Sequence, residues 1–346
     1  MIANLKAMVG GMVCGITLFT LCGEQPTMAQ EKRVVKIGVI GILAEAGLYV
    51  AAERGFFAQE GLQAEFLKDM YGPDGFPALA TGQMDAMGGA FGPELINAVA
   101  RGINAKVVGG LSSYIPGWDS GFLTVRKELI DSGKVKDYKD LKGLKVALAP
   151  ALPNLTDYFA ARYLALGGLT LKDVTIVNIP FANMIAGLKT GGVDFAHTSE
   201  PMSTLTVGAG VAVKWKPVTS YAPTGLTVAI LHFGPSLLEK NPEVGERLMA
   251  AYIRGARYYN DALKKPTGKG EIAEILMKYT PVKNRALYDQ IAFSYSDPDA
   301  VVSVDGMQDM AGHFARTTGA KPIDARTMVD ERFRLAAVKR LGPYQK

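Results

Sequence analysis

Cysteine is nearly missing from this sequence of 346 residues. Only Cys14 and Cys22 occur, and both lie in one uncharged run near the N-terminus. If that run is removed during export, the remaining chain carries no thiol. It can then form no disulfide bond, bind no metal through thiolates and use no cysteine as a nucleophile.

Charged residues are missing from the same run, which covers 7–23 as "AMVGGMVCGITLFTLCG" after Lys6. Thr27 and Ala29 then offer small residues, and polar residues follow. A basic start, an apolar core and a small-residue cut are typical of a secretory signal peptide. We therefore expect 1–29 to be a cleaved signal peptide and the mature protein to be periplasmic. A retained membrane anchor is the alternative, because the run is longer than many signal cores.

Blocks of like charge are also missing. The chain has 38 lysine and arginine residues against 33 aspartate and glutamate residues, and the formal net charge of +5 is scattered. No basic stripe is therefore present that would bind a nucleic acid. With 48% hydrophobic and 21% charged residues, the composition is that of a globular protein. The length favours about two domains.

From Val34 onward, segments rich in β-branched residues alternate with amphipathic segments. "VVKIGVIGI" (34–42) and "LQAEFL" (62–67) are typical of buried strands, and between them Leu48 and Phe56 lie on one face of an expected helix. This alternation predicts an α/β fold with a mostly parallel sheet in each of two units. In such sheets, ligands bind beyond the carboxyl ends of the strands.

One phrase occurs twice in the chain. "LATGQMDAMGGAFGPE" (79–94) and "LKTGGVDFAHTSEP" (188–201) share Leu-x-Thr-Gly-x-x-Asp, an uncharged run and a proline. We expect each copy to form a helix, a turn, a short strand and the start of another helix, once per unit. Because both runs follow a strand and precede a helix, we expect Ala90–Phe91 and Thr198–Ser199 to face each other across a cleft.

Lysine and arginine are missing from every loop that we expect at the cleft, and acids are present instead. The acids favour a neutral or amine-bearing ligand, or else they only stabilise first helical turns through the helix dipole. The loops are 41–47, 88–94, 112–121, 149–157, 197–202 and 217–224, and the acids are Glu45, Glu94, Asp119, Asp157 and Glu200.

The candidate ligand-binding residues come from these loops, and each has a structural alternative. Trp118 either stacks on a flat ligand or packs against a hinge. Gly89 either lets the backbone approach a ligand or permits tight helix–strand packing. Asn154 either binds the ligand or caps a helix, and capping is favoured. The full set is Leu43, Ala44, Glu45, Gly89, Ala90, Phe91, Tyr114, Trp118, Asn154, Thr156, Thr198, Ser199, Glu200 and Tyr221.

No catalytic set emerges from the sequence. The three histidines, His197, His232 and His313, are far apart and lack metal-ligand spacing. Only His197 falls in an expected cleft loop, where a structural role is favoured. We therefore expect no catalytic residue, no metal site and no cofactor.

Several segments together resemble a known family. "GVIGILAEAGLYVAAERGFFAQEGLQAEF", "LATGQMDAMGGAFGPE", "LKGLKVALAP" and "GLKTGGVDFAHTSEP" are similar to the solute-binding proteins of bacterial ABC importers, in the nitrate/sulfonate/taurine and thiamine-pyrimidine-like branch. The resemblance implies a two-lobed class II periplasmic binding fold. Lobe one would be 33–122 and 226–346, and lobe two would be 123–225. Two crossing strands, near 121–126 and 226–233, would form the hinge.

The resemblance also implies a function. The chain would be a monomeric, periplasmic component of an ABC importer that captures a sulfonate, aromatic acid, pyrimidine or amine by hinge closure. It would deliver this molecule to a permease in the inner membrane. One alternative is an enzyme on the same fold, similar to thiamine pyrimidine synthases, which are intracellular and use a histidine and a cysteine-rich segment. Another is a sensory accessory protein that passes its closed state to a receptor.

Overall fold

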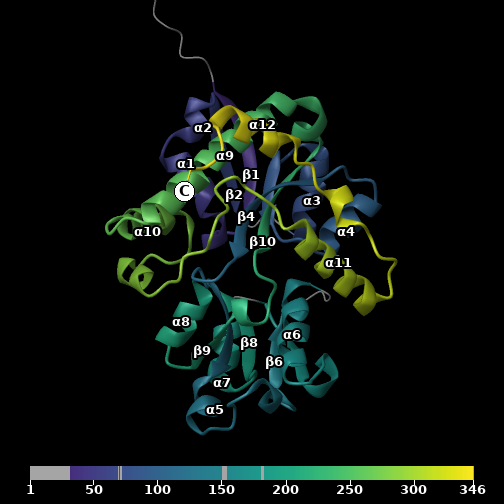
Figure 1. Ribbon diagram of the computed structural model, residues 1–346, viewed down its shortest axis with the longest axis vertical. Helices are drawn as coiled ribbons and strands as arrows, with labels where there is room; N and C mark the ends of the chain where they lie inside the picture. Colours follow the sequence, from purple (N-terminus) through teal and green to yellow (C-terminus); the bar gives the residue numbers. More distant parts are fainter. Residues whose placement is uncertain (1–31, 69, 71, 150–153, 181–182, 346) are drawn as a thin grey trace, which may run out of the picture. The chain divides into compact units, whose positions relative to one another are not determined.

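The computed structural model describes residues 32–345 except 69, 71, 150–153 and 181–182 (Figure 1). The expected signal peptide lies outside this range. The described residues form two five-stranded sheets with helices packed against them, which confirms the predicted α/β class. Within the described residues, no helix combines the length and the apolar character that crossing a membrane requires.

The first sheet has the strand order β2-β1-β3-β10-β4. Strand β1 pairs in parallel with β2 and β3, whereas β10 runs antiparallel to β3 and β4. Four strands therefore point one way and β10 opposes them. The strands are β1 Arg33–Val39, β2 Leu62–Lys68, β3 Ala86–Gly89, β4 Lys106–Tyr114 and β10 Leu226–Phe233.

The second sheet follows the same plan, with the order β7-β6-β8-β5-β9. Strand β6 pairs in parallel with β7 and β8, and β5 runs antiparallel to β8 and β9. The strands are β5 Gly121–Arg126, β6 Lys145–Leu148, β7 Thr175–Asn178, β8 Phe195–Ser199 and β9 Ala212–Pro217.

A structural repeat underlies this shared plan. The backbone N–H of Lys36 donates to Asp85 Oδ2 at 2.9 Å, and that of Lys145 donates to Asp194 Oδ2 at 2.9 Å. Each pair is 49 residues apart, and the second pair follows the first at a constant offset of 109 positions (36 to 145, 85 to 194). The strand register agrees, because β1 aligns Ile37 with Ala86 and β6 aligns Val146 with Phe195. The repeated phrase is therefore one connector used in both sheets.

The helices cover both sheets and form most of the chain beyond Pro235. Helices α1, α2, α3, α4, α9, α10, α11 and α12 go with the first sheet, and α5, α6, α7 and α8 with the second. Their bounds are α1 Ala46–Glu53, α2 Phe56–Gln59, α3 Gly72–Thr81, α4 Pro93–Ala100, α5 Lys127–Asp131, α6 Leu155–Leu166, α7 Met184–Thr190, α8 Met202–Gly208, α9 Pro242–Leu263, α10 Gly268–Tyr279, α11 Val304–Thr318 and α12 Arg332–Leu341.

Two links join the sheets, and they differ in place from the expected hinge strands. Strand β5 pairs only within the second sheet and β10 only within the first, so the chain crosses at 115–120 and returns at 218–225. The Thr219 hydroxyl donates to the Asp119 carboxylate, so the two links are bonded to each other. Strands of the second sheet begin at Gly121, two residues before the expected boundary.

Candidate ligand-binding site

The repeat places four helix starts at equivalent positions after strands. Glu45 is the N-cap of α1, and Asn154, 109 positions later, is the N-cap of α6. Gly92 is the N-cap of α4, and Pro201, at the same offset, is the N-cap of α8. These helices follow β1, β6, β3 and β8. The first turns of these helices therefore lie at the strand ends where α/β sheets bind ligands.

Glu45 is hydrogen-bonded by residues close to it in the chain. Its side chain is buried and accepts hydrogen bonds from the backbone N–H groups of 40–42, at 2.9 to 3.2 Å, and from the Tyr49 hydroxyl at 2.6 Å. Burial raises the pKa of this carboxyl, and the hydrogen bonds oppose that rise. The carboxylate therefore orders the loop after β1 and has few acceptor positions left for a ligand.

The start of α6 is ordered in a similar way. The Asn154 Oδ1 accepts the Thr156 N–H at 2.8 Å and the Thr156 hydroxyl at 2.6 Å. The Thr156 Oγ1 in turn accepts the N–H of Ala149 at 2.9 Å. Asn154 thus caps the helix, as the sequence favours, and both side chains stay partly exposed.

Glu200 pairs with a lysine that lies outside the loops expected at the cleft. Its Oε1 lies 2.6 Å from Lys214 Nζ and accepts the Thr204 hydroxyl at 3.0 Å. The N–H of Ala292, which belongs to the C-terminal part, donates to the same oxygen at 3.3 Å. Lys214 lies in β9, so it enters the site from a strand interior and not from a loop.

Two of the other three acids also have partners inside the chain, and the third, Glu94, is largely buried. Asp157 accepts the His313 ring N–H at 2.7 Å, and Asp119 accepts the Thr219 hydroxyl of the neighbouring link. Glu94 is mostly enclosed at the start of α4, and burial raises the pKa of its carboxyl. Four of the five acids therefore have partners inside the chain, which favours the structural interpretation over an amine-binding one.

A tyrosine joins the two sheets at the strand ends. The Tyr114 hydroxyl, at the end of β4, lies 3.1 Å from Ser199 Oγ at the end of β8. Tyr114 is 3% exposed, and burial raises its pKa to about 12, so it stays a neutral hydroxyl. Ser199 is therefore placed against the first sheet. That Ala90–Phe91 also faces Thr198–Ser199 stays a prediction.

An enclosed aromatic cluster supports this contact. His197 stacks on Phe159 with ring centroids 4.4 Å apart, and its Nδ1 lies 2.8 Å from the Tyr221 hydroxyl. Burial lowers the pKa of His197 to about 3, so the ring is neutral at ordinary pH. Tyr221 is 5% exposed. The rings of His197 and Phe159 also pack against the Tyr114 ring, with centroids 6.3 Å and 5.9 Å away. The structural role favoured for His197 agrees with this geometry.

Several predicted residues contribute side chains to packing and not to an open surface. Leu43 and Phe91 are each 1% exposed in hydrophobic cores, and Thr198 is fully buried with its hydroxyl 2.5 Å from Thr124 Oγ1. That these three residues bind a ligand stays a prediction, and their buried side chains leave the backbone as the exposed part for such a contact. Trp118 is half-buried against Tyr295 at 5.7 Å between centroids. The remaining members, Ala44, Gly89 and Ala90, are partly exposed.

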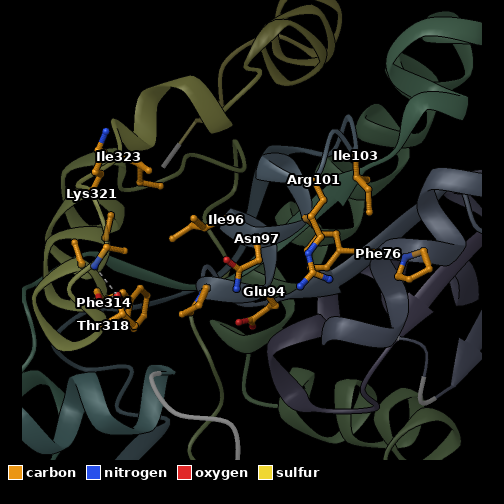
Figure 2. Close-up of a pocket in the computed structure, with 16 residues that line it drawn as sticks. Phe76, Glu94, Ile96, Asn97, Arg101, Ile103, Phe314, Thr318, Lys321 and Ile323 are labelled. Atoms are coloured by element: carbon orange, nitrogen blue, oxygen red, sulfur yellow. Dashed lines mark hydrogen bonds between the residues drawn. The ribbon is translucent and has the colours of Figure 1, made fainter.

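A groove of about 560 Å³ lies between α3, α4 and α11. Pro93 and Glu94 at the start of α4 line it, but none of the candidate ligand-binding residues does. Figure 2 shows Glu94 and Asn97 between Phe76 on one side and Phe314 on the other. The described residues contain no group of three or more histidine, cysteine, aspartate or glutamate side chains placed to hold a metal ion.

Comparison with known proteins gives a consistent result. Residues 44–268 match the model of a family described as NMT1/THI5 like. The nitrate/nitrite binding protein NrtA of Synechocystis sp. is 27% identical over 276 residues, which are 72% of this chain and 58% of the relative. This chain therefore spans less than two thirds of that relative's length.

Two solved structures illustrate the likeness of fold. One is the ligand-binding component of an ABC-type import system from Staphylococcus aureus, with a TM-score of 0.73, 16% identity and coverage of 88% of this chain and 99% of that one. The other is the desulfurization enzyme DSZB, with a TM-score of 0.61, 14% identity and coverage of 90% and 100%. The fold thus occurs in a binding protein and in an enzyme.

Proposed function

Because the chain belongs to the NMT1/THI5-like family, we propose that it is the solute-binding component of an ABC importer. The observation that carries the proposal is the repeat, which provides a pair of helix N-termini after strands once in each sheet. Backbone N–H groups at such ends bind ligands without side-chain charge. The likeness to NrtA and to the staphylococcal import component supports the same conclusion.

The proposed place of action is the periplasm. The apolar N-terminal run, followed by small residues, supports export, and removal near Ala29 leaves a chain without cysteine. There the protein works as a monomer and passes its ligand to a permease in the inner membrane. Closure of two lobes about the bonded links at 115–120 and 218–225 is the proposed capture step.

The ligand is a small molecule whose recognition relies on backbone donors and hydroxyls. The amine class has lost its main support, because four of the five acids near the strand ends have partners inside the chain. A sulfonate, an aromatic acid or a pyrimidine fits better, since each offers acceptor atoms to N–H groups. Nitrate and bicarbonate belong in the same test, because relatives are named for binding them.

A thermal-shift screen of these ligand classes tests the proposal. A ligand present at 100 times its dissociation constant stabilises the protein by about 2.7 kcal/mol, which raises the melting temperature measurably. Titration calorimetry on any hit then measures the dissociation constant. If the folded protein responds to none of the five compound classes, the proposed function is contradicted.

A cleft variant makes the test specific. Ala90→Arg places a long cation at the end of β3, and we expect at least about tenfold weaker binding, equivalent to about 1.4 kcal/mol. Ala90 is partly exposed, so the ligand-free melting temperature should change by only a few degrees. Ser199→Arg is a poorer probe, because it also removes the partner of the Tyr114 hydroxyl. Binding by Ala90→Arg at parental affinity would place the site elsewhere.

The enzyme alternative is supported by the likeness of fold, but the two buried histidines do not support it. His197 and His232 are enclosed, and burial lowers their pKa values to about 3 and about 4. Neither ring is exposed enough to exchange protons with a substrate, since they are 4% and 1% exposed. We therefore propose a binding role.

A further inference from the structure

Two helices that belong to different sheets are joined by a cluster of polar contacts. Helix α6 packs against β8 of the second sheet, and α11 packs against β10 of the first (Figure 1). Asp309 Oδ2 on α11 accepts the Tyr158 hydroxyl at 2.7 Å and lies 2.9 Å from Arg162 Nη1. His313, one turn further along α11, lies with Nε2 2.7 Å from Asp157 Oδ2.

The His313–Asp157 contact is the deeper of the two. The Asp157 side chain is 2% exposed and that of His313 is 13%, whereas Arg162 and Asp309 are 35% and 42% exposed. An exposed ion pair is screened by water and contributes little, but breaking a buried pair leaves a polar group without a partner. We therefore expect the histidine contact to matter more than the arginine contact.

Asp157 is shared between the contact and the ligand loop. Its other oxygen, Oδ1, accepts the backbone N–H of Asn154 in the capping box that starts α6. One carboxylate therefore orders the first turn of α6 and joins that turn to α11. Asn154 and Thr156, both predicted to lie at the ligand, belong to the same turn.

The repeat shows what is particular about this place. Tyr49 and Tyr158 occupy equivalent positions, 109 residues apart, one turn into α1 and α6. The Tyr49 hydroxyl donates to Glu45 of its own helix start, whereas the Tyr158 hydroxyl donates to Asp309 on α11. In the first copy the tyrosine bonds within its own helix, whereas in the second copy it bonds to a helix that packs on the other sheet.

Arg162 extends the cluster to the return link. Its Nε donates to the carbonyl of Tyr221 at 2.9 Å, while its Nη1 faces Asp309. The same side chain therefore contacts α11 and the link at 218–225. Loss of the cluster would affect the link and the first turn of α6 together.

We infer that His313 and Asp309 are positioning residues that act through α6: they hold its first turn in the ligand-binding geometry only while α6 and α11 are in contact. The inference rests on the proposed function and adds a regulation to the same site. When the two helices separate, Asp157 and Tyr158 lose their partners on α11, and the first turn of α6 becomes less ordered. Opening of the lobes therefore weakens the part of the ligand site that the second sheet provides.

Hydrogen exchange on the full-length, ligand-free protein tests this coupling. In His313→Ala, the backbone amides of 156–159 should exchange at least about tenfold faster, because the local opening that exposes them becomes easier. His313→Gln, which keeps an N–H donor near Asp157, should restore exchange to within about threefold of the parent. Asp305→Ala is the matched control on α11, since the Asp305 side chain is 96% exposed.

Small-angle scattering on the same variants separates positioning from simple packing. His313→Ala and Asp309→Ala should each increase the ligand-free radius of gyration, while Asp305→Ala and His313→Gln leave it unchanged. Faster exchange at 156–159 with an unchanged radius of gyration would mean that the contact only stabilises the start of α6, and it would overturn the inference. Unchanged exchange in His313→Ala would overturn it as well.

These outcomes are independent of the ligand. If the screened compounds bind but His313→Ala behaves as the parent in both measurements, the coupling is wrong and the solute-binding function stands. If His313→Ala loosens 156–159 and expands the protein but no compound binds, the coupling stands and the function fails. A melting curve for each variant confirms that the measurements are made on folded protein.

Discussion

At the scale of single residues, burial decides the charge of two histidines. Burial lowers the pKa of His197 to about 3 and that of His232 to about 4, whereas an unfolded histidine titrates near 6.5. The unfolded state therefore takes up protons first as the pH falls. The stability that each neutral ring provides is complete above about pH 6.5 and is lost as the pH falls towards its folded pKa.

His197→Phe should make the protein less sensitive to acid. Between about pH 6.5 and 5, one buried histidine lowers the free energy of unfolding by about 2 kcal/mol, at about 1.4 kcal/mol per pH unit. The variant should therefore lose about 2 kcal/mol less than the parent between pH 7 and pH 5 in urea unfolding. Phe159→Leu, next to the ring, is the control that perturbs packing without removing a titrating group. An equal pH dependence in His197→Phe and the parent would contradict the assignment.

The sequence predicts helix caps better than contacts between strands. Asn154 was expected to cap a helix and does so, because capping depends on local chain direction. The Glu200–Lys214 pair was missed, because the lysine comes from β9 and the pairing depends on how strands lie side by side. No spacing along the chain links His313 to Asp157, so that contact also depends on how distant elements pack.

At the scale of elements, the repeated phrase fixes how each sheet is built. Asp85 and Asp194 each accept a backbone N–H from a neighbouring parallel strand, that of Lys36 in β1 and that of Lys145 in β6, at 2.9 Å in both copies. Each also has a second partner, the Ser236 hydroxyl at 2.6 Å for Asp85 and Arg126 Nη1 at 3.1 Å for Asp194. The phrase is visible in the sequence, but these second partners depend on long-range packing and are not.

Asp85→Ala and Asp194→Ala should therefore destabilise the protein by similar amounts. Each leaves a partly buried backbone N–H without its acceptor, which costs about 1–3 kcal/mol. The midpoint of urea unfolding measures the loss, and Asp305→Ala, which is highly exposed, should change it little. If only one of the two aspartates matters, the repeat is a similarity of sequence without a shared structural role.

At the scale of the whole molecule, the two links decide what motion is available. The links are bonded through Asp119 and Thr219, and the return link is also tied to β4 by the Gly225 N–H, which donates to the Tyr114 carbonyl at 2.8 Å. Neither link is paired as a strand. A change of backbone angles there can therefore reorient one sheet against the other while the pairings inside each sheet stay intact.

Ligand binding should consequently compact the protein. A ligand that contacts helix starts from both sheets stabilises only the closed arrangement, and it shifts the population by its difference in affinity for the two arrangements. Small-angle scattering at saturating concentration of a screened ligand should give a smaller radius of gyration than the ligand-free protein.

Gly208→Ala, which adds a methyl group with no atom within 4 Å, should close as the parent does. Ala90→Arg, at a concentration that saturates the parent, should remain expanded, because the added cation occupies the space over which closure occurs. An unchanged radius in the saturated parent would mean that the links are rigid and that the ligand enters a site already formed.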